Sequence, residues 1–155
     1  MQWLIVRLSG VEFALPMEPV REMMQLRGQT LCAIPPCGQF RYCLRVNGAW
    51  LPVGVPHERL GLRPRPISAR SCVVLAESTK LRGSPVCYGI MVDSISRTEV
   101  YKEDELRPTN PETGEPLPYT LGRLRWNGKW HLALDLGALF PRQDLEKATL
   151  APTAA

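Results

Sequence analysis

Hydrophobic and polar residues alternate in short segments along most of the chain, which is the pattern of β-strands with one buried face. The strands predicted from this pattern span residues 2–8, 11–15, 30–34, 40–46, 49–55, 71–77, 87–95, 119–126 and 129–134. Residues 21–26 fit a strand or a helix equally well. Two dipeptides, Asn47-Gly48 and Asn127-Gly128, each lie between apolar segments. Asn and Gly tolerate the positive φ of a type I′ turn, so each dipeptide predicts a β-hairpin.

The predicted strands follow one another closely, and no helix of convincing length is predicted before residue 135. Such spacing is typical of small antiparallel barrels. We predict an all-β, mainly antiparallel fold with short helical turns, in which two small five-stranded SH3-like or OB-like β-barrel subdomains pack together around a shared core. The expected domain covers 1–145, with subdomains at about 11–66 and about 67–140 and strand exchange from 1–10. Residues 146–155 are predicted to form a tail.

The composition is that of a globular protein, since 45% of the 155 residues are hydrophobic and 22% are charged. The net charge is +4, but the 19 basic residues are scattered along the chain, whereas nucleic-acid-binding proteins usually concentrate them. No apolar stretch approaches the roughly 20 residues that a helix needs to cross a bilayer. The first residues also lack the basic segment of an export signal. We therefore expect a cytoplasmic protein without membrane insertion.

The residue types that usually carry enzyme chemistry do not form a known motif in this sequence. It contains no GxSxG, GxxxxGK[ST] or GxGxxG segment. His57-Glu58 begins like the metalloprotease motif HExxH, but Gly61 occupies the position of the second histidine, and we interpret His57 as a surface residue. Asp93 and Asp135 follow apolar segments, where a carboxylate usually accepts hydrogen bonds from backbone N–H groups. We predict no catalytic residues, no metal site and no cofactor.

The chain has five cysteines: Cys32, Cys37, Cys43, Cys72 and Cys87. An odd number without an export signal indicates reduced thiols. Cys43, Cys72 and Cys87 lie within apolar predicted strands, where cysteine behaves as a small hydrophobic residue. Neither a CxxC pair nor a close Cys/His pair is present, which argues against a zinc site.

Several segments, taken in order, resemble the CheW-like adaptors of bacterial chemosensory arrays. The best match is Tyr88–Ile95 (YGIMVDSI), which is similar to the family pattern G-[IL]-x-V-D-x-V. Weaker matches are the opening strand pair 3–16 followed by Val20–Met23, the loop Ala33–Pro35, the segments 48–53 and 59–62, and the closing segments 121–124 and 132–136. The resemblance extends over about residues 1–140, and the order and spacing of the segments make it specific.

The resemblance implies two five-stranded barrels, no enzymatic activity and no cofactor. It also implies an adaptor that couples the cytoplasmic tip of chemoreceptors to the regulatory domain of a CheA-type histidine kinase. Other CheW-like proteins are further expected partners, and the expected location is cytoplasmic, at membrane-associated receptor arrays. In this family the receptor occupies a groove between the barrels. The positions that the resemblance places near that groove or its rim are Val20, Glu22, Met23, Leu44, Val92 and Ile95.

The sequence departs from the family pattern G-V-[IV]-N-L-R-G that precedes the proline-containing strand. Tyr42 replaces the glycine, Arg45 the asparagine and Asn47 the arginine that the family associates with coupling. We therefore include Arg45 and Asn47 among the receptor- or kinase-binding positions. The departure favours a divergent or accessory chemosensory system, such as one that controls pili or surface behaviour.

A second function class remains open, because an Arg-rich small barrel can bind single-stranded nucleic acid by stacking bases on exposed aromatic side chains. Such a protein needs its aromatic residues on one strand face. The tryptophans are instead spread over distant segments, at Trp3, Trp50, Trp126 and Trp130. This spread favours the adaptor.

Overall fold

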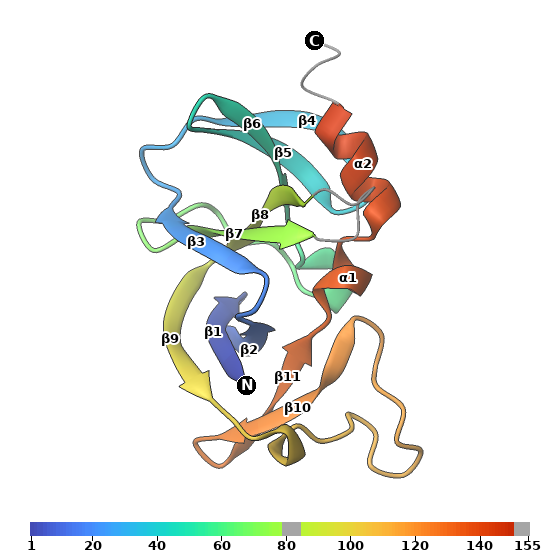
Figure 1. Cartoon of the computed structure of the whole chain (residues 1–155). Helices are drawn as coiled ribbons and strands as arrows, with labels where there is room; N and C mark the ends of the chain where they lie inside the picture. The colour runs from blue at the N-terminus through green and yellow to red at the C-terminus, as the bar shows by residue number, and fades with distance from the viewer. Residues whose placement is uncertain (79–84, 151–155) are drawn as a thin grey trace.

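The structure, a computed structural model, describes residues 1–78 and 85–150. Within these residues, eleven strands form two sheets, one in each half of the molecule as drawn in Figure 1. Sheet A has the order β10 (Thr120–Trp126), β11 (Lys129–Leu134), β2 (Val11–Pro16), β1 (Gln2–Leu8) and β9 (Ser94–Val100). Sheet B has the order β3 (Val20–Gln25), β7 (Cys72–Ser78), β8 (Val86–Val92), β6 (Ala49–Gly54), β5 (Phe40–Val46) and β4 (Leu31–Cys37). Helices α1 (Leu136–Leu139) and α2 (Arg142–Leu150) follow, and short 3-10 turns lie at Glu58–Leu60 and Glu103–Glu105.

The prediction of a mainly antiparallel β fold is confirmed, because only the β11–β2 and β6–β8 ladders of the described residues are parallel. The prediction of two five-stranded barrels needs correction. Sheet B has six strands, and in the described residues no ladder joins the outer strands of either sheet to close a barrel. The ambiguous segment 21–26 belongs mostly to strand β3.

The chain is divided between the sheets differently from the predicted subdomains. All six strands of sheet B lie between residues 20 and 92, whereas sheet A combines residues 2–16 with residues 94–134. The expected boundary near residue 66 does not coincide with a change of sheet, because β7 and β8 pair with strands of the first half. Of the predicted tail, residues 146–150 continue helix α2, and residues 151–155 lie outside the described part.

Three apolar clusters form the core. The central cluster lies between the sheets and contains Leu4, Val6, Phe13, Phe40, Val74, Tyr88, Ile90, Val92 and Phe140, among others. Each sheet also has a cluster on its other face. The sheet A cluster is formed by Trp3, Ile5, Ala14, Leu124, Trp126 and Ala133, and the sheet B cluster by Leu26, Leu44, Val53, Val73 and Leu75. Successive residues of β1 and β7 therefore enter different clusters, so these strands are apolar on both faces.

Both Asn-Gly hairpins form as predicted. The φ angles are 50° at Asn47, 82° at Gly48, 51° at Asn127 and 72° at Gly128. A type I′ turn requires positive φ at both central residues, and the dipeptides connect β5 to β6 and β10 to β11. The 3-10 turn after β6 ends at Gly61, whose φ of 73° lies in the left-handed region that favours glycine.

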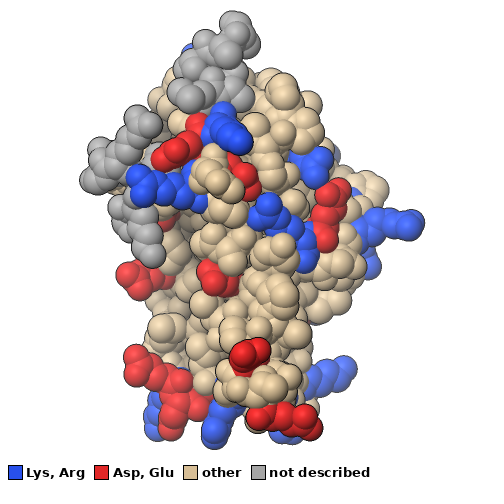
Figure 2. Space-filling model, turned by 90° about the vertical axis from the view of Figure 1, so that its right-hand side faces the viewer, with Lys and Arg blue, Asp and Glu red and all other residues tan. Residues whose placement is uncertain are grey.

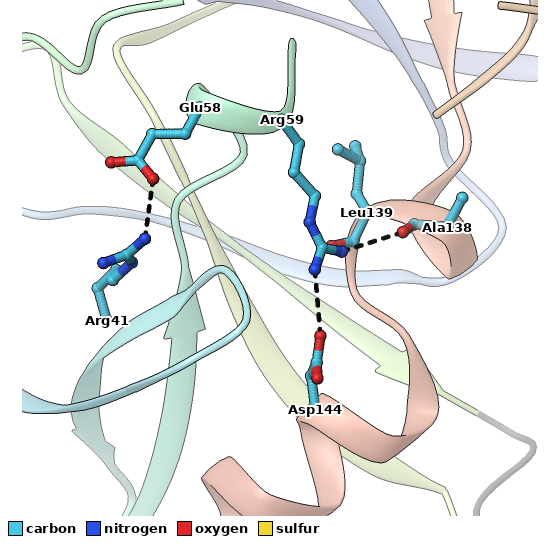
Figure 3. A network of polar contacts seen from close by, with 6 residues as sticks. All are labelled: Arg41, Glu58, Arg59, Ala138, Leu139 and Asp144. Carbon is cyan, nitrogen blue, oxygen red and sulfur yellow. Dashed lines mark hydrogen bonds and ion pairs between the residues drawn. The ribbon is translucent and has the colours of Figure 1, made fainter. Parts of the chain in front are cut away.

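One arginine anchors the C-terminal helices to sheet B (Figure 3). Arg59 Nη1 donates to the carbonyl oxygens of Ala138 at 3.2 Å and Leu139 at 2.7 Å, which end α1. Its Nη2 lies 3.3 Å from Asp144 Oδ2 on α2. The last carbonyl groups of a helix have no hydrogen-bond donor within the helix, and a charged side chain can supply one. Helix α2 is thereby held beside β4, β5 and β6, as Figure 1 shows.

Candidate partner-binding groove

An open groove lies between the two sheets. We name it the inter-sheet groove, and its lining residues are Arg7 of β1, Gln25 of β3, Cys72 of β7, Ser94, Ile95 and Ser96 of β9, and Ala69 and Arg70 of the connector before β7. This lining contains two arginines and no carboxylate. A groove with this charge favours a partner segment that presents carboxylate or carbonyl oxygens.

Of the sequence-predicted positions, Ile95 lines this groove, and Val20 and Met23 lie on β3, the strand that carries the lining residue Gln25. Val20 and Ile95 are half-buried and pack on the central cluster, from β3 and β9 respectively. Val92 is a member of the same cluster and only 1% exposed, so it is a core residue. Met23 is 43% exposed and pairs with Val74, so it lies on the face of β3 that also carries Gln25.

Glu22 is exposed on β3, next to a register shift in the β3–β7 ladder. A strand bulge of this kind re-aims the side chains around it. Glu22 therefore lies on the rim strand of the groove with its carboxylate open to solvent. It is the acidic residue of the predicted set, whereas the groove lining itself is basic.

The other three predicted positions lie elsewhere in sheet B. Leu44 is 0% exposed and belongs to the sheet B cluster, so it has no surface to offer a partner. Arg45 and Asn47 are exposed at the end of the β5–β6 hairpin. The guanidinium of Arg45 lies 5.9 Å from the ring centroid of Trp50, which is itself 38% exposed. The hairpin end is thus a second exposed region, separate from the groove residues.

A polar network fixes the junction where the chain passes from β8 to β9. His57 Nε2 lies 3.2 Å from Asp93 Oδ1, and Asp93 Oδ2 accepts a hydrogen bond from the backbone N–H of Ser9. Ser9 Oγ in turn donates to the carbonyl oxygen of Arg63. The network connects the β1–β2 turn, the β8–β9 junction and the connector after β6. It therefore holds the two walls of the groove in one relative orientation.

This network corrects one interpretation and confirms two others. His57 is 1% exposed and is a buried partner of Asp93, not a surface residue. The order of apolar and polar residues in 55–61 did not indicate that His57 is buried. Asp93 accepts from the Ser9 N–H, and Asp135 Oδ1 accepts from the Ala138 N–H at 3.2 Å, as expected for carboxylates that follow strands.

The sequence matches the family model described as CheW-like domain over residues 2–144. The chain belongs to the CheW-like family. It is therefore a non-enzymatic scaffolding and coupling protein of chemotaxis signalling. The match covers nearly all of the described strands, including the whole of both groove walls.

The fold of this CheW-like protein is similar to a solved structure titled as the scaffolding protein TtCheW from Thermoanaerobacter tengcongensis. The two share 20% sequence identity with a TM-score of 0.72, over 92% of this chain and 89% of that chain. No curated protein matches the sequence. The structural similarity therefore supports the fold, and the family model shows that the chain belongs to the CheW-like family.

The lining arginines are the groove residues that the sequence analysis of this CheW-like chain missed. Arg7 interrupts the buried run of β1 and is exposed, which is a detectable signal because a charge in a strand that is otherwise buried on both faces needs an opening. Arg70 and Gln25 gave no comparable signal, because both lie among other polar residues.

The lining residue Ser96 is tied to the sheet A cluster through Glu12. Ser96 Oγ, from a groove-lining residue, donates to Glu12 Oε2 at 3.2 Å, and Trp126 Nε1 donates to Glu12 Oε1 at 3.0 Å. The pKa of Glu12 is lowered, mainly by the Trp126 hydrogen bond and further by Ser96 and the nearby Arg97. Glu12 is thus held as a carboxylate that orders β2, β9 and β10 relative to one another.

Surface charge and aromatic placement do not form a nucleic-acid-binding face in the described part of this CheW-like chain. Figure 2 shows Lys and Arg side chains interspersed with Asp and Glu side chains over the face in view. Trp3 and Trp126 are buried, at 1% and 6% exposure. The exposed tryptophans, Trp50 and Trp130, lie in different sheets, so they do not form one stacking platform.

Residues 1–78 and 85–150 contain no group of three or more His, Cys, Asp and Glu side chains that could hold a metal ion. Within the same residues, no helix has the length and apolar character needed to cross a membrane.

Proposed function

We propose that this CheW-like protein couples the cytoplasmic tip of chemoreceptors to the regulatory domain of a CheA-type histidine kinase. The inter-sheet groove is the observation that carries the proposal. Its walls come from both sheets, the exposed Met23 lies on β3 of one wall, and its lining includes Arg7 and Arg70. An exposed apolar anchor beside fixed charges is the usual composition of a protein-binding site.

The kinase contact is proposed to include the β5–β6 hairpin end, where Arg45 and Asn47 are exposed. Because these residues replace the asparagine and arginine of the family pattern, the partner kinase is proposed to belong to a divergent or accessory system, for example one that controls pili or surface behaviour. Contacts with other CheW-like proteins would extend the assembly. The proposed location is cytoplasmic, at membrane-associated receptor arrays.

The groove is tested with one substitution and a matched control. Met23→Glu places a charge at the rim, whereas Leu121→Glu does the same at a side chain of equal exposure, 43%, on β10 of sheet A. Binding of the receptor cytoplasmic fragment, measured by titration calorimetry, should weaken at least about tenfold for Met23→Glu and remain unchanged for Leu121→Glu. Equal effects of both substitutions would show that the groove is not the receptor-binding site.

The kinase contact is tested by capturing the regulatory domain of the kinase encoded in the same genome, at low and high salt. An apolar contact predicts binding that persists at high salt. No capture of the kinase domain, together with retention on single-stranded nucleic acid at low salt only, would replace the coupling proposal by the nucleic-acid alternative.

The divergent system is tested separately, in a reconstituted array that contains a standard flagellar kinase. This protein is expected to activate that kinase poorly, and Asn47→Arg is expected to raise the activation. Full activation by the unmodified chain would refute the assignment to a divergent system while leaving the coupling function intact.

A further inference from the structure

Two free cysteines lie directly opposite each other on neighbouring strands. In the antiparallel β4–β5 ladder, Cys32 is the register partner of Cys43. Opposite residues of such a ladder point to the same face, and their Cα atoms are about 4.5–5.5 Å apart. This separation falls within the range of about 4.4–6.8 Å that a disulfide spans. The backbone therefore already has the geometry that a cross-strand disulfide needs.

The two thiols differ in access and influence each other. Cys32 is exposed on the outer strand of sheet B, whereas Cys43 is buried, with 6% of its surface accessible. Burial raises the pKa of the Cys43 thiol, and the neighbouring Cys32 thiol raises it further, which places the two side chains in each other's immediate surroundings. An oxidant from solvent therefore reaches the thiol of Cys32 more easily than that of Cys43.

The other cysteines lack such a partner across their ladders. Cys37 pairs with Phe40, Cys72 with Val92, and Cys87 with Glu77. Among the five thiols, all of which lie in the described residues, Cys32 and Cys43 form the one cross-strand pair. Any oxidative chemistry that joins two thiols within the folded chain should therefore be confined to this pair.

We propose that Cys32 and Cys43 form a peroxide-sensitive dithiol that hydrogen peroxide converts into a disulfide between β4 and β5. The Cys32 thiolate attacks one peroxide oxygen, the O–O bond breaks, and protonation of the departing oxygen gives water and a sulfenic acid on Cys32. The Cys43 thiolate then attacks the Cys32 sulfur and expels hydroxide, which takes up a proton to form a second water. Two thiols lose two electrons and two protons, and one peroxide is reduced to two waters.

The disulfide would act on an edge strand of sheet B whose pairing is interrupted. β4 lies at the sheet edge, and its pairing with β5 is interrupted between Ala33 and Cys37, where Pro35 and Pro36 interrupt the run of backbone donors. Regular pairing is thus confined to the three residues around Cys32. A covalent bond in this short stretch would suppress fraying of β4, which is measurable as slower amide hydrogen exchange. The proposal does not depend on the coupling function.

The decisive experiment treats the folded, reduced full-length chain with hydrogen peroxide, denatures it, alkylates the remaining thiols and measures its intact mass. The expected product is a monomer that takes up three alkyl groups instead of five and has lost about 2 Da before alkylation. Peptide mapping without reductant should show a cross-link between Cys32 and Cys43, and dithiothreitol should reverse it.

Two variants provide the controls. Cys32→Ser should abolish the mass loss, whereas Cys37→Ser, at the other end of the same strand, should leave it unchanged. A different cross-linked pair, a disulfide-linked dimer, or over-oxidation of Cys32 with Cys43 still free would each overturn the proposal. Mapping of the unsubstituted chain gives this answer independently of how the variants fold.

Discussion

Replacing Leu44 by alanine tests whether this residue contacts a binding partner or only stabilises the fold. The side chain is fully enclosed in the sheet B cluster with Leu26, Val53, Val73 and Leu75. Alanine removes three carbon atoms, which at about 0.8 kcal/mol each corresponds to a transfer term of about 2.4 kcal/mol. The cavity left behind raises the expected cost to about 2–5 kcal/mol of unfolding free energy.

This loss is measured by urea denaturation, and in a thermal melt it corresponds to a decrease in Tm of about 5–15 °C for a chain of this length. Met23→Ala is the control, because truncating an exposed side chain should change the unfolding free energy by less than about 0.5 kcal/mol. At a temperature where both variants are folded, Leu44→Ala should bind kinase and receptor normally. Weakened binding at unchanged stability would refute the reasoning and show that Leu44 contacts a partner.

Three further predictions concern residues at contacts between strands, helices and turns. Because the folded-state pKa of Glu12 lies below its ordinary value of 4.5, its contribution is complete above that pH and is lost as the pH falls through the lowered pKa; Glu12→Gln should therefore make urea stability less steeply dependent on pH in the acid range. A Cβ at Gly54 would lie 2.2 Å from a Phe140 ring carbon, so Gly54→Ala should cost about 1–3 kcal/mol by urea denaturation. Asp93→Ala leaves the His57 ring and the Ser9 N–H without their acceptor; a loss of about 1–3 kcal/mol in the same assay is expected, and an unchanged midpoint would contradict the role assigned to the junction.

Local chemistry explains which parts of the fold could be predicted. The two Asn-Gly turns and the strands beside them depend on φ preferences and on the alternation of neighbours, and both kinds of information lie within a few residues. Strand β9 was not separated from β8, because its sequence SISRTEV alternates weakly and its partner β1 lies more than 80 residues away. The change of sheet at Asp93 depends on that distant pairing.

The groove was predictable only in part, for a similar reason. Resemblance identified Ile95, which lines the groove, and Val20 and Met23, which lie on the same strand as the lining residue Gln25. It also placed Leu44 there, although this residue lies in a cluster on the other face of sheet B. When a strand is apolar on both faces, its sequence does not predict which face packs against the other sheet. The packing of the two sheets determines this.

The distribution of the sheets along the chain has a consequence for synthesis on the ribosome. Sheet B is encoded without interruption, so its strands can pair as they emerge. The β1–β2 hairpin instead needs β9 and β11, and the last of these begins 113 residues after β2 ends. At about 5–20 residues per second, the hairpin waits roughly 6–23 s, during which Trp3 and Ile5 lack the β10 and β11 residues of the sheet A cluster. The nascent chain thus presents a target for chaperones at the β1–β2 hairpin until β11 has been synthesised.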